Sequence, residues 1–174
     1  MRRRAALVLS SVFIVVALGL AACGGRRAAG WAVDRALGWR FEGVPTITTA
    51  ALAARLAGAD PPLLIDARTA AEYAVSHLPG ARQVAPDADP AVALADVPRD
   101  RAVAVYCSVG WRSAVFAERM AAAGFVAVVN VEGSIFRWAL EDRPLVDGSG
   151  APTARVHAFG APWSWLVPAD RRVE

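Results

Sequence analysis

Short apolar runs alternate with amphipathic stretches through the middle of the chain. Residues 63–65, 102–106 and 126–129 form short, continuous apolar runs, which is the pattern of buried β-strands. A further short strand is expected near Gln83 and Val84. Strands that alternate with helices form βαβ units, so the pattern predicts an α/β fold with a central parallel sheet and helices on both faces.

Local signals mark the limits of the helices. Thr69 and Glu72 have the spacing of a capping box, in which each side chain binds a backbone amide of the first turn, so a helix is expected directly after the first strand. Apolar side chains one turn apart predict another helix over residues 113–123, which a glycine ends. Residues 48–56 are predicted to form an opening helix, and residues 86–98 a surface connection with a short helix at its centre.

One cysteine, Cys107, follows the apolar run 102–106 and precedes a helix. In an open parallel sheet the ligand crevice lies beyond the carboxyl ends of the strands. A thiolate is the reactive form of cysteine and is stabilised beside arginine or at a helix N-terminus, and Arg112 lies five residues on. Gly110 allows a tight turn whose amides face one centre. Cys107 is therefore a candidate nucleophile, with a buried and inert cysteine as the alternative from position alone.

Three segments, in this order, resemble the signatures of the rhodanese homology domain, the fold of thiosulfate and related sulfurtransferases. Residues 63–81 contain an acidic strand end, a short helix and a His-x-Pro-Gly-Ala turn; residues 107–113 match the active-site loop as Cys-x-x-Gly-x-Arg-Ser; residues 130–138 resemble a segment with Glu-Gly-Gly and a following Trp. The resemblance covers about residues 45–146. It implies a rhodanese-like domain with its active-site loop at the carboxyl end of a strand.

Two positions depart from the family pattern. The residue after the cysteine, often Arg in the family, is Ser108, which makes the loop less cationic and bears on the choice of sulfur donor. The second glycine of the third segment is Ser134, a change that we expect not to touch the chemistry.

The resemblance implies a sulfurtransferase that works in two steps. The Cys107 thiolate would attack the outer sulfur of a donor such as thiosulfate, and the resulting persulfide would pass that sulfur to a thiol or cyanide acceptor. Loop amides would stabilise the persulfide, and Arg112 would hold the donor's oxygens. Trp111 would form a pocket wall, with a plain surface aromatic as the alternative. No metal or organic cofactor is implied. The expected substrate-binding residues are Ser108, Val109, Gly110, Trp111, Arg112 and Ser113.

The polar residues of the first segment are expected to support the loop rather than to react. Asp66 and Arg68 can form a structural hydrogen-bond network near it, and Glu72 caps its helix. His77 begins a turn, and the loop itself favours a thiolate, so no histidine base is assigned.

Two alternatives to a free sulfurtransferase remain. Cysteine phosphatases that share the fold place five residues between Cys and Arg, whereas residues 108–111 make four here. A tighter ring of amides suits a persulfide better than a phosphate ester, so a phosphatase or arsenate reductase is the weaker alternative. The other is a rhodanese-fold module that relays sulfur or docks partners without turnover as a free enzyme.

The N-terminus resembles a bacterial lipoprotein signal. Arg2, Arg3 and Arg4 precede residues 5–20, which carry no charge, and Leu-Ala-Ala precedes Cys23. Cys23 is the expected lipidation site, and an uncleaved N-terminal anchor is the alternative. Either places the domain in the cell envelope, membrane-anchored and outside the cytoplasm.

The chain is expected to hold one globular domain with extensions at both ends. Residues 30–43 are expected to include a helix that either rests near the membrane interface or packs on the domain. The C-terminal extension, with Trp163 and Trp165, is expected to fold back over an apolar groove or to dock a partner. The expected divisions are a signal or anchor (1–23), a juxtamembrane linker (24–44), the rhodanese-like domain (45–146) and the C-terminal extension (147–174).

The net charge of the chain without the signal segment limits the classes of partner that are expected. The chain has 19 basic and 16 acidic residues, and removing Arg2, Arg3 and Arg4 leaves 16 of each, so no nucleic-acid surface is expected. With Cys23 lipidated, Cys107 has no cysteine partner. In an oxidising envelope we therefore expect a thiol reductant among its partners, besides a small sulfur donor and a thiol acceptor.

Overall fold

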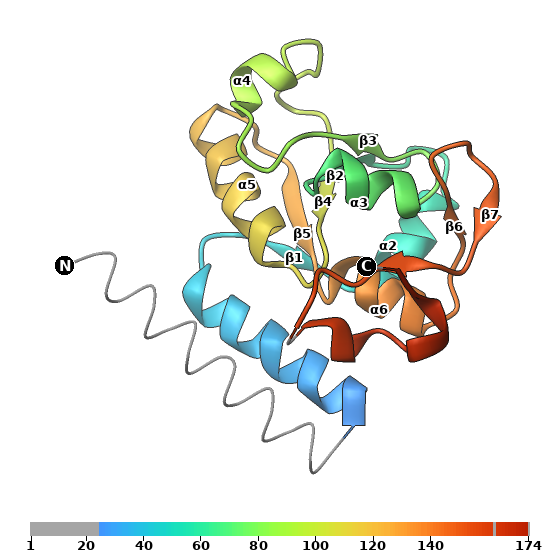
Figure 1. Cartoon of the computed structure of the whole chain (residues 1–174). Helices are drawn as coiled ribbons and strands as arrows, with labels where there is room; N and C mark the ends of the chain where they lie inside the picture. The colour runs from blue at the N-terminus through green and yellow to red at the C-terminus, as the bar shows by residue number, and fades with distance from the viewer. Residues whose placement is uncertain (1–24, 162, 174) are drawn as a thin grey trace.

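The computed structural model describes residues 25–161 and 163–173 (Figure 1). The expected signal segment 1–23, with its lipidation site Cys23, lies outside these residues. Within the described part of the chain, no helix combines the length and the apolar composition that crossing a membrane requires.

A parallel sheet of five strands forms the centre of the domain, in the order β1-β5-β4-β2-β3 (Figure 1). β4, which ends at the residue before Cys107, lies between β2 and β5. The α/β fold with a central parallel sheet, predicted from the sequence, is therefore confirmed. The strands are β1 (Thr46–Ile47), β2 (Leu63–Asp66), β3 (Arg82–Gln83), β4 (Val103–Tyr106) and β5 (Val128–Val131).

Helices cover both faces of the sheet, as predicted (Figure 1). The capping box at the start of α3 is present, because Thr69 Oγ1 accepts from the Glu72 amide and the Glu72 carboxylate accepts from the Thr69 amide. α5 begins at Trp111 rather than at Ser113, so the helix starts within the active-site loop. The helices are α2 (Thr49–Leu56), α3 (Ala70–Val75), α4 (Pro90–Ala93), α5 (Trp111–Ala122) and α6 (Ser134–Leu140).

The side chains of β4 alternate between two hydrophobic cores. Val103 and Val105 pack in the core that contains α5, whereas Ala104 and Tyr106 pack in the core that contains α6. A parallel strand that is buried on both faces is apolar along its whole length, which explains the continuous apolar run in the sequence. Burial of each valine side chain contributes roughly 1.5–3 kcal/mol. The strand therefore gives Cys107 a rigid base.

Residues 25–40 form a helix, here called the 25–40 helix, which is drawn in blue in Figure 1. Ala29, Val33 and Leu37, with Phe41 just beyond its end, follow one another at intervals of four residues and are buried in the two cores. The sequence assigns residues 24–44 to a linker and leaves two positions open for a helix within it. The structure shows the one that packs on the domain.

The C-terminal extension folds back onto the domain. Trp163 and Trp165 pack against the cores, and Leu166 and Val167 are buried. β6 pairs with β7, and β8 with β9, as two small sheets at the margin of the domain. The elements of this region are β6 (Leu145–Val146), β7 (Pro152–Thr153), β8 (Val156–His157), the 3-10 helices η1 (Trp163–Leu166) and η2 (Ala169–Arg171), and β9 (Arg172–Val173).

Candidate active site

Cys107 lies directly after β4, at the carboxyl end of a central strand, and only 1% of it is exposed. Its Sγ accepts a hydrogen bond from the backbone amide of Gly110 at 3.1 Å. The loop therefore turns back toward the sulfur and holds an N–H donor against it. A fixed donor of this kind stabilises negative charge on the atom that it faces.

Gly110 is required at its position for two reasons. Its φ of 106° lies in a region that residues with a side chain rarely adopt, and a Cβ built on it would lie 3.0 Å from Leu37 Cδ1. Its carbonyl accepts from Asn130 Nδ2 at 3.1 Å and from the Ala114 amide at 3.1 Å. Sheet, loop and 25–40 helix thus all meet at this residue.

The start of α6 holds the other side of the loop. Ser134 Oγ accepts from the Cys107 amide at 3.1 Å and donates to the Val131 carbonyl at 3.0 Å. The Ile135 and Phe136 amides donate to the Cys107 and Ser108 carbonyls, at 3.1 Å and 3.2 Å. The serine that replaces a family glycine thus hydrogen-bonds to the backbone of the candidate nucleophile.

Arg112 is paired inside the protein. Its Nη1 and Nη2 donate to the two oxygens of Glu72 at 2.8 Å and 2.6 Å, a bidentate contact, and Nη2 also donates to Ser108 Oγ at 2.8 Å. The Phe159 ring covers the guanidinium, whose Cζ lies 4.6 Å from the ring centre. The cation that the sequence assigns to the sulfur donor is therefore already matched by a carboxylate.

The pKa of Glu72 falls from 4.5 to about 2. Burial alone would raise it, but the hydrogen bonds from Arg112 and Thr69 and the charge of Arg112 outweigh burial. Burial likewise opposes the charged form of Arg112, while Glu72 and the nearby Cys107 outweigh it and raise the pKa of Arg112. Both partners are thus held ionised, and their charges cancel.

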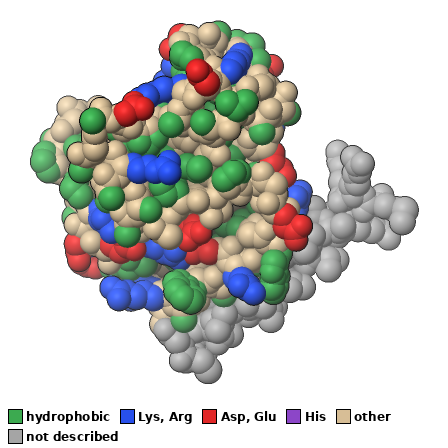
Figure 2. Space-filling view, turned by 180° about the vertical axis from the view of Figure 1, so that it is seen from behind, with side chains coloured by type: hydrophobic (Ala, Val, Ile, Leu, Met, Phe, Trp, Pro, Cys, Tyr) green, Lys and Arg blue, Asp and Glu red, His purple; other side chains and the backbone are tan. Residues whose placement is uncertain are grey.

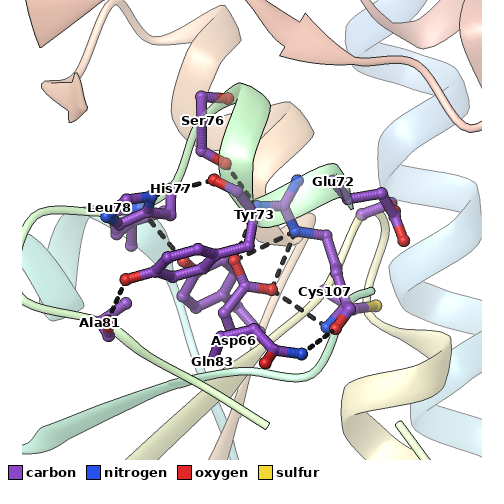
Figure 3. Close-up of polar contacts among 12 residues, drawn as sticks. Asp66, Glu72, Tyr73, Ser76, His77, Leu78, Ala81, Gln83 and Cys107 are labelled. Atoms are coloured by element: carbon purple, nitrogen blue, oxygen red, sulfur yellow. Dashed lines mark hydrogen bonds and ion pairs between the residues drawn. The ribbon is translucent and has the colours of Figure 1, made fainter. Parts of the chain in front are cut away.

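A second buried ion pair, between Asp66 and Arg68, lies near the loop. Asp66 and Arg68 are fully buried, and Arg68 donates to both carboxylate oxygens, from Nε at 2.9 Å and from Nη2 at 2.6 Å. Arg68 Nη2 also donates to the Ser76 carbonyl at 2.6 Å, and Gln83 Nε2 donates to the Arg68 carbonyl at 2.8 Å. Figure 3 shows this network beside Cys107. It ties the ends of β2 and β3 to the end of α3.

The His-x-Pro-Gly-Ala turn joins the same network (Figure 3). The Leu78 amide donates to the hydroxyl of Tyr106 at 3.1 Å, and the Tyr73 hydroxyl donates to the Ala81 carbonyl at 2.8 Å. The His77 ring stacks on Tyr73 with 3.6 Å between ring centres. The His77 side chain is therefore held within the turn by its packing on Tyr73.

Segments from both ends of the chain enclose the loop. Leu37 of the 25–40 helix approaches Gly110, and Phe41 packs edge-on against Trp111 with ring centres 5.2 Å apart. On the other side Phe159 of the C-terminal extension covers Arg112. These contacts cover Gly110, Trp111 and Arg112, the loop residues that follow Cys107.

A groove of about 840 Å³ runs beside the loop. It lies between the 25–40 helix, the start of α2 and one side of α6, and Val109 lines it from the loop. Cys107 is not part of its wall. Within residues 25–161 and 163–173, no three His, Cys, Asp or Glu side chains are grouped so that they could hold a metal ion.

Some of the expected substrate-binding residues lie close to the Cys107 sulfur, and others lie farther from it. The Gly110 amide bonds the sulfur, and the side chains of Ser108 and Arg112 form one polar cluster with Glu72. Ser113 is fully buried within α5. Val109 and Trp111 lie at the margins of the loop. Val109 lines the groove, and Trp111 packs against Phe41.

Three contacts escape the sequence interpretation. The four-residue spacing of the buried side chains in the 25–40 helix is visible in the sequence and could have indicated Leu37 as a packing residue. Ser134 is visible in the sequence as the replacement of a family glycine, and its φ of 49° is a left-handed value that suits glycine, but only the structure shows its hydroxyl at Cys107. Nothing in the sequence signals that Phe159 covers Arg112.

A family model described as a rhodanese-like domain matches residues 48–141. The chain belongs to the rhodanese-like domain family. The matched range contains the Cys107 loop, Glu72 and Ser134, whereas the 25–40 helix and Phe159 lie outside it. The enclosure of the loop is thus made by segments that flank the rhodanese-like domain.

Relatives of this rhodanese-like domain carry related names. A sulfurtransferase of Allochromatium vinosum is 35% identical over 107 residues, which cover 62% of this chain and 99% of that protein. A probable adenylyltransferase/sulfurtransferase, MoeZ, of Mycobacterium tuberculosis is 34% identical over 82 residues, 47% of this chain and 21% of that protein. The crystal structure of a rhodanese-like domain protein from Staphylococcus aureus aligns with a TM-score of 0.51 and 32% identity, covering 55% of this chain and 91% of that one.

Proposed function

We propose that this protein is a sulfurtransferase that carries sulfane sulfur on Cys107. The observation that supports the proposal most directly is the Gly110 amide, 3.1 Å from Sγ, in a loop with four residues between Cys107 and Arg112. The loop forms a small site for a negatively charged sulfur at the end of β4. Family membership and a named sulfurtransferase relative point the same way.

The chemistry balances in two displacement steps. The Cys107 thiolate attacks the outer sulfur of thiosulfate, a carbon-bound sulfur gains a sulfur–sulfur bond, and sulfite leaves with the electron pair of the bond that breaks. An acceptor thiolate or cyanide then attacks the outer sulfur of the Cys107 persulfide. A persulfide or thiocyanate forms, and the Cys107 thiolate is restored. A persulfide donor enters the first step in the same way, with a thiolate as the leaving group.

The loop residues have defined parts in these steps. The Gly110 amide stabilises the negative sulfur, and Ser134 and the α6 amides hold the loop backbone while charge moves. Arg112 and Glu72 fix the start of α5 and the Ser108 hydroxyl.

The test is turnover of thiosulfate and cyanide to thiocyanate by the full chain, beside a Cys107→Ser variant that has the same thermal midpoint. We expect thiocyanate release by the native protein and none above background by the variant. Equal release by both proteins contradicts a Cys107 route. Hydrolysis of an aryl phosphate without thiocyanate release points instead to the phosphatase alternative.

A second candidate is a sulfur-relay subunit that receives sulfur from another protein. Two observations favour it: Arg112 is neutralised by Glu72, and Cys107 is 1% exposed, so a free thiosulfate dianion meets no unpaired loop cation and little open sulfur. Comparing kcat/KM for the small donors thiosulfate and glutathione persulfide with that for a persulfidated protein donor separates the candidates. A clear preference for the protein donor favours the relay, and a preference for the small donors excludes it.

We also propose that residues 1–23 attach the domain to a membrane outside the cytoplasm. The support is the sequence itself, with Arg2, Arg3 and Arg4, an uncharged run, and Cys23 after Leu-Ala-Ala. Fractionation of cells that produce the native chain or a Cys23→Ser variant tests the proposal. A membrane-bound native chain that carries lipid mass at Cys23 is expected, and a native chain in the cytosolic fraction contradicts it.

A further inference from the structure

The 25–40 helix presents two opposite stripes of side chains. Ala29, Val33 and Leu37 are buried against the domain. Arg27, Arg35 and the two tryptophans Trp31 and Trp39 also recur every four residues, offset by two positions from the buried stripe. Two positions correspond to about 200° around a helix. The second stripe therefore lies on the solvent-exposed side of the helix, where its four residues also line the groove between this helix and α2 and α6, and we call it the Arg-Trp stripe.

The tryptophans of the Arg-Trp stripe are unusually open to solvent. Trp31 is 76% exposed and Trp39 is 68% exposed, and the Arg35 guanidinium lies 5.3 Å from the centre of the Trp39 ring. Large exposed apolar side chains in a group, rather than singly, mark surfaces that bind a partner. Figure 2 shows basic and hydrophobic side chains alternating along the lower edge of the molecule.

The net charge of this stripe is positive because the acidic residue of the helix is used elsewhere. Asp34 is turned toward the domain, where it is paired with Arg137 and accepts from the Gly133 amide at 2.8 Å. Arg26 likewise faces the domain and donates to the Trp165 carbonyl at 3.0 Å. Arg27 and Arg35 are left on the exposed face with the tryptophans.

This combination suits the surface of an anionic membrane. Tryptophan is favoured at the boundary between headgroups and acyl chains, and arginine is attracted to anionic headgroups while its stem packs on apolar surface. A second copy of the chain would bring two positively charged stripes together, which is unfavourable. The chain that leads into the helix also has no charge over residues 5–20, which suits a membrane segment next to the stripe.

We propose that the Arg-Trp stripe binds the anionic lipid surface of the membrane. The inference extends the proposed attachment through residues 1–23 and rests on it in part, but not on the sulfur donor. The opposite face of the same helix contacts the catalytic loop, through Leu37 at Gly110. Binding therefore fixes the orientation of the Cys107 loop relative to the bilayer.

The test uses the full chain with phosphatidylcholine vesicles, with and without phosphatidylglycerol, that contain brominated acyl chains. Bromine quenches only the tryptophans that reach the bilayer. We expect quenching to be strong with phosphatidylglycerol, and most of it to disappear in a Trp31→Phe/Trp39→Phe variant. Trp163→Phe, a change at a residue that packs on the core, is the matched control and keeps the quenched component. Arg27→Glu/Arg35→Glu lowers quenching only in vesicles with the anionic lipid.

Flotation of the vesicles is measured in parallel, because it reports attachment by any part of the chain. Flotation with the same quenching in native protein and the Trp31→Phe/Trp39→Phe variant overturns the stripe proposal and leaves the attachment proposal standing. A chain that does not float overturns both. A dimer in detergent that the Trp31→Phe/Trp39→Phe variant abolishes assigns the stripe to a second copy and also overturns the proposal. Each variant is compared only if its thermal midpoint matches that of the native protein, so that unfolding does not cause the difference.

Discussion

The charge of Glu72 is expected to be a large contribution to the stability of this domain, and Glu72→Gln isolates it. Glutamine can still accept the capping hydrogen bond at the start of α3, so the variant keeps the helix cap and removes the negative charge opposite Arg112. The side chain of Glu72 is 3% exposed, so solvent screens the pair only weakly. The variant leaves the Arg112 cation, 20% exposed, without its partner.

The size of the effect follows from the pKa of Glu72. The pKa falls from 4.5 to about 2 in the folded protein, and each unit corresponds to about 1.4 kcal/mol, so the ionised form contributes about 3 kcal/mol to the free energy of unfolding. Because the folded pKa is the lower one, this stability is fully present above pH 4.5 and is lost as the pH falls toward 2.

The assay is urea unfolding of native protein and Glu72→Gln at pH 7 and in steps down to pH 3. We expect the variant to be about 3 kcal/mol less stable at pH 7, and the gap to shrink to roughly half at pH 3. Asp96→Asn, which breaks an exposed pair with Arg82, is the matched control and should leave the midpoint nearly unchanged. A Glu72→Gln gap below ~1 kcal/mol at pH 7, or one that does not change with pH, refutes the reasoning.

Three further substitutions probe the loop and its supports. Gly110→Ala places a side chain at φ 106°, so it is expected to cost about 1–2 kcal/mol in urea unfolding and to slow thiocyanate release; native rates count against the role of the Gly110 amide. Leu37→Ala removes a side chain that covers the loop, so Cys107 should react faster with a thiol reagent although the protein loses about 2–5 kcal/mol; an unchanged labelling rate in the folded variant excludes the enclosure. Arg68→Met leaves Asp66 buried and unpaired, for an expected loss of about 3–5 kcal/mol, and a loss within the error of the urea fit contradicts a structural pair.

Much of the fold could be predicted because its signals are local. The apolar run that became β4 and the capping box of Thr69 and Glu72 each depend on residues close together in the chain. The position of Cys107 at the carboxyl end of a parallel strand follows from the same patterns. The two-residue strand β1 escapes prediction, because too few residues alternate to produce a period.

The polar contacts of the site depend on distant residues and could not be derived in the same way. Arg112 and Glu72 are 40 positions apart, and the sequence patterns that identify each one contain no information about their distance. The interpretation of Arg112 as a ligand for the donor followed from the family resemblance of the loop. Ser134 illustrates the same limit, since its hydroxyl reaches Cys107 across 27 positions.

The packing of the 25–40 helix on the domain could not be predicted, for a different reason. The large tryptophans Trp31 and Trp39 lie on the exposed face of the 25–40 helix, while the smaller Val33 and Leu37 on the other face make the contacts with the domain. Long-range packing of a flanking helix leaves only a four-residue spacing in the sequence, and that spacing does not specify the partner.

The intact mass of the full chain after anaerobic incubation with thiosulfate or glutathione persulfide tests the central claim most directly. The account predicts a gain of one sulfur atom on the native protein and none on Cys107→Ser, with the added mass lost when cyanide is supplied and thiocyanate is released. An unchanged mass with both donors, or an equal gain on Cys107→Ser, contradicts sulfur transfer through Cys107.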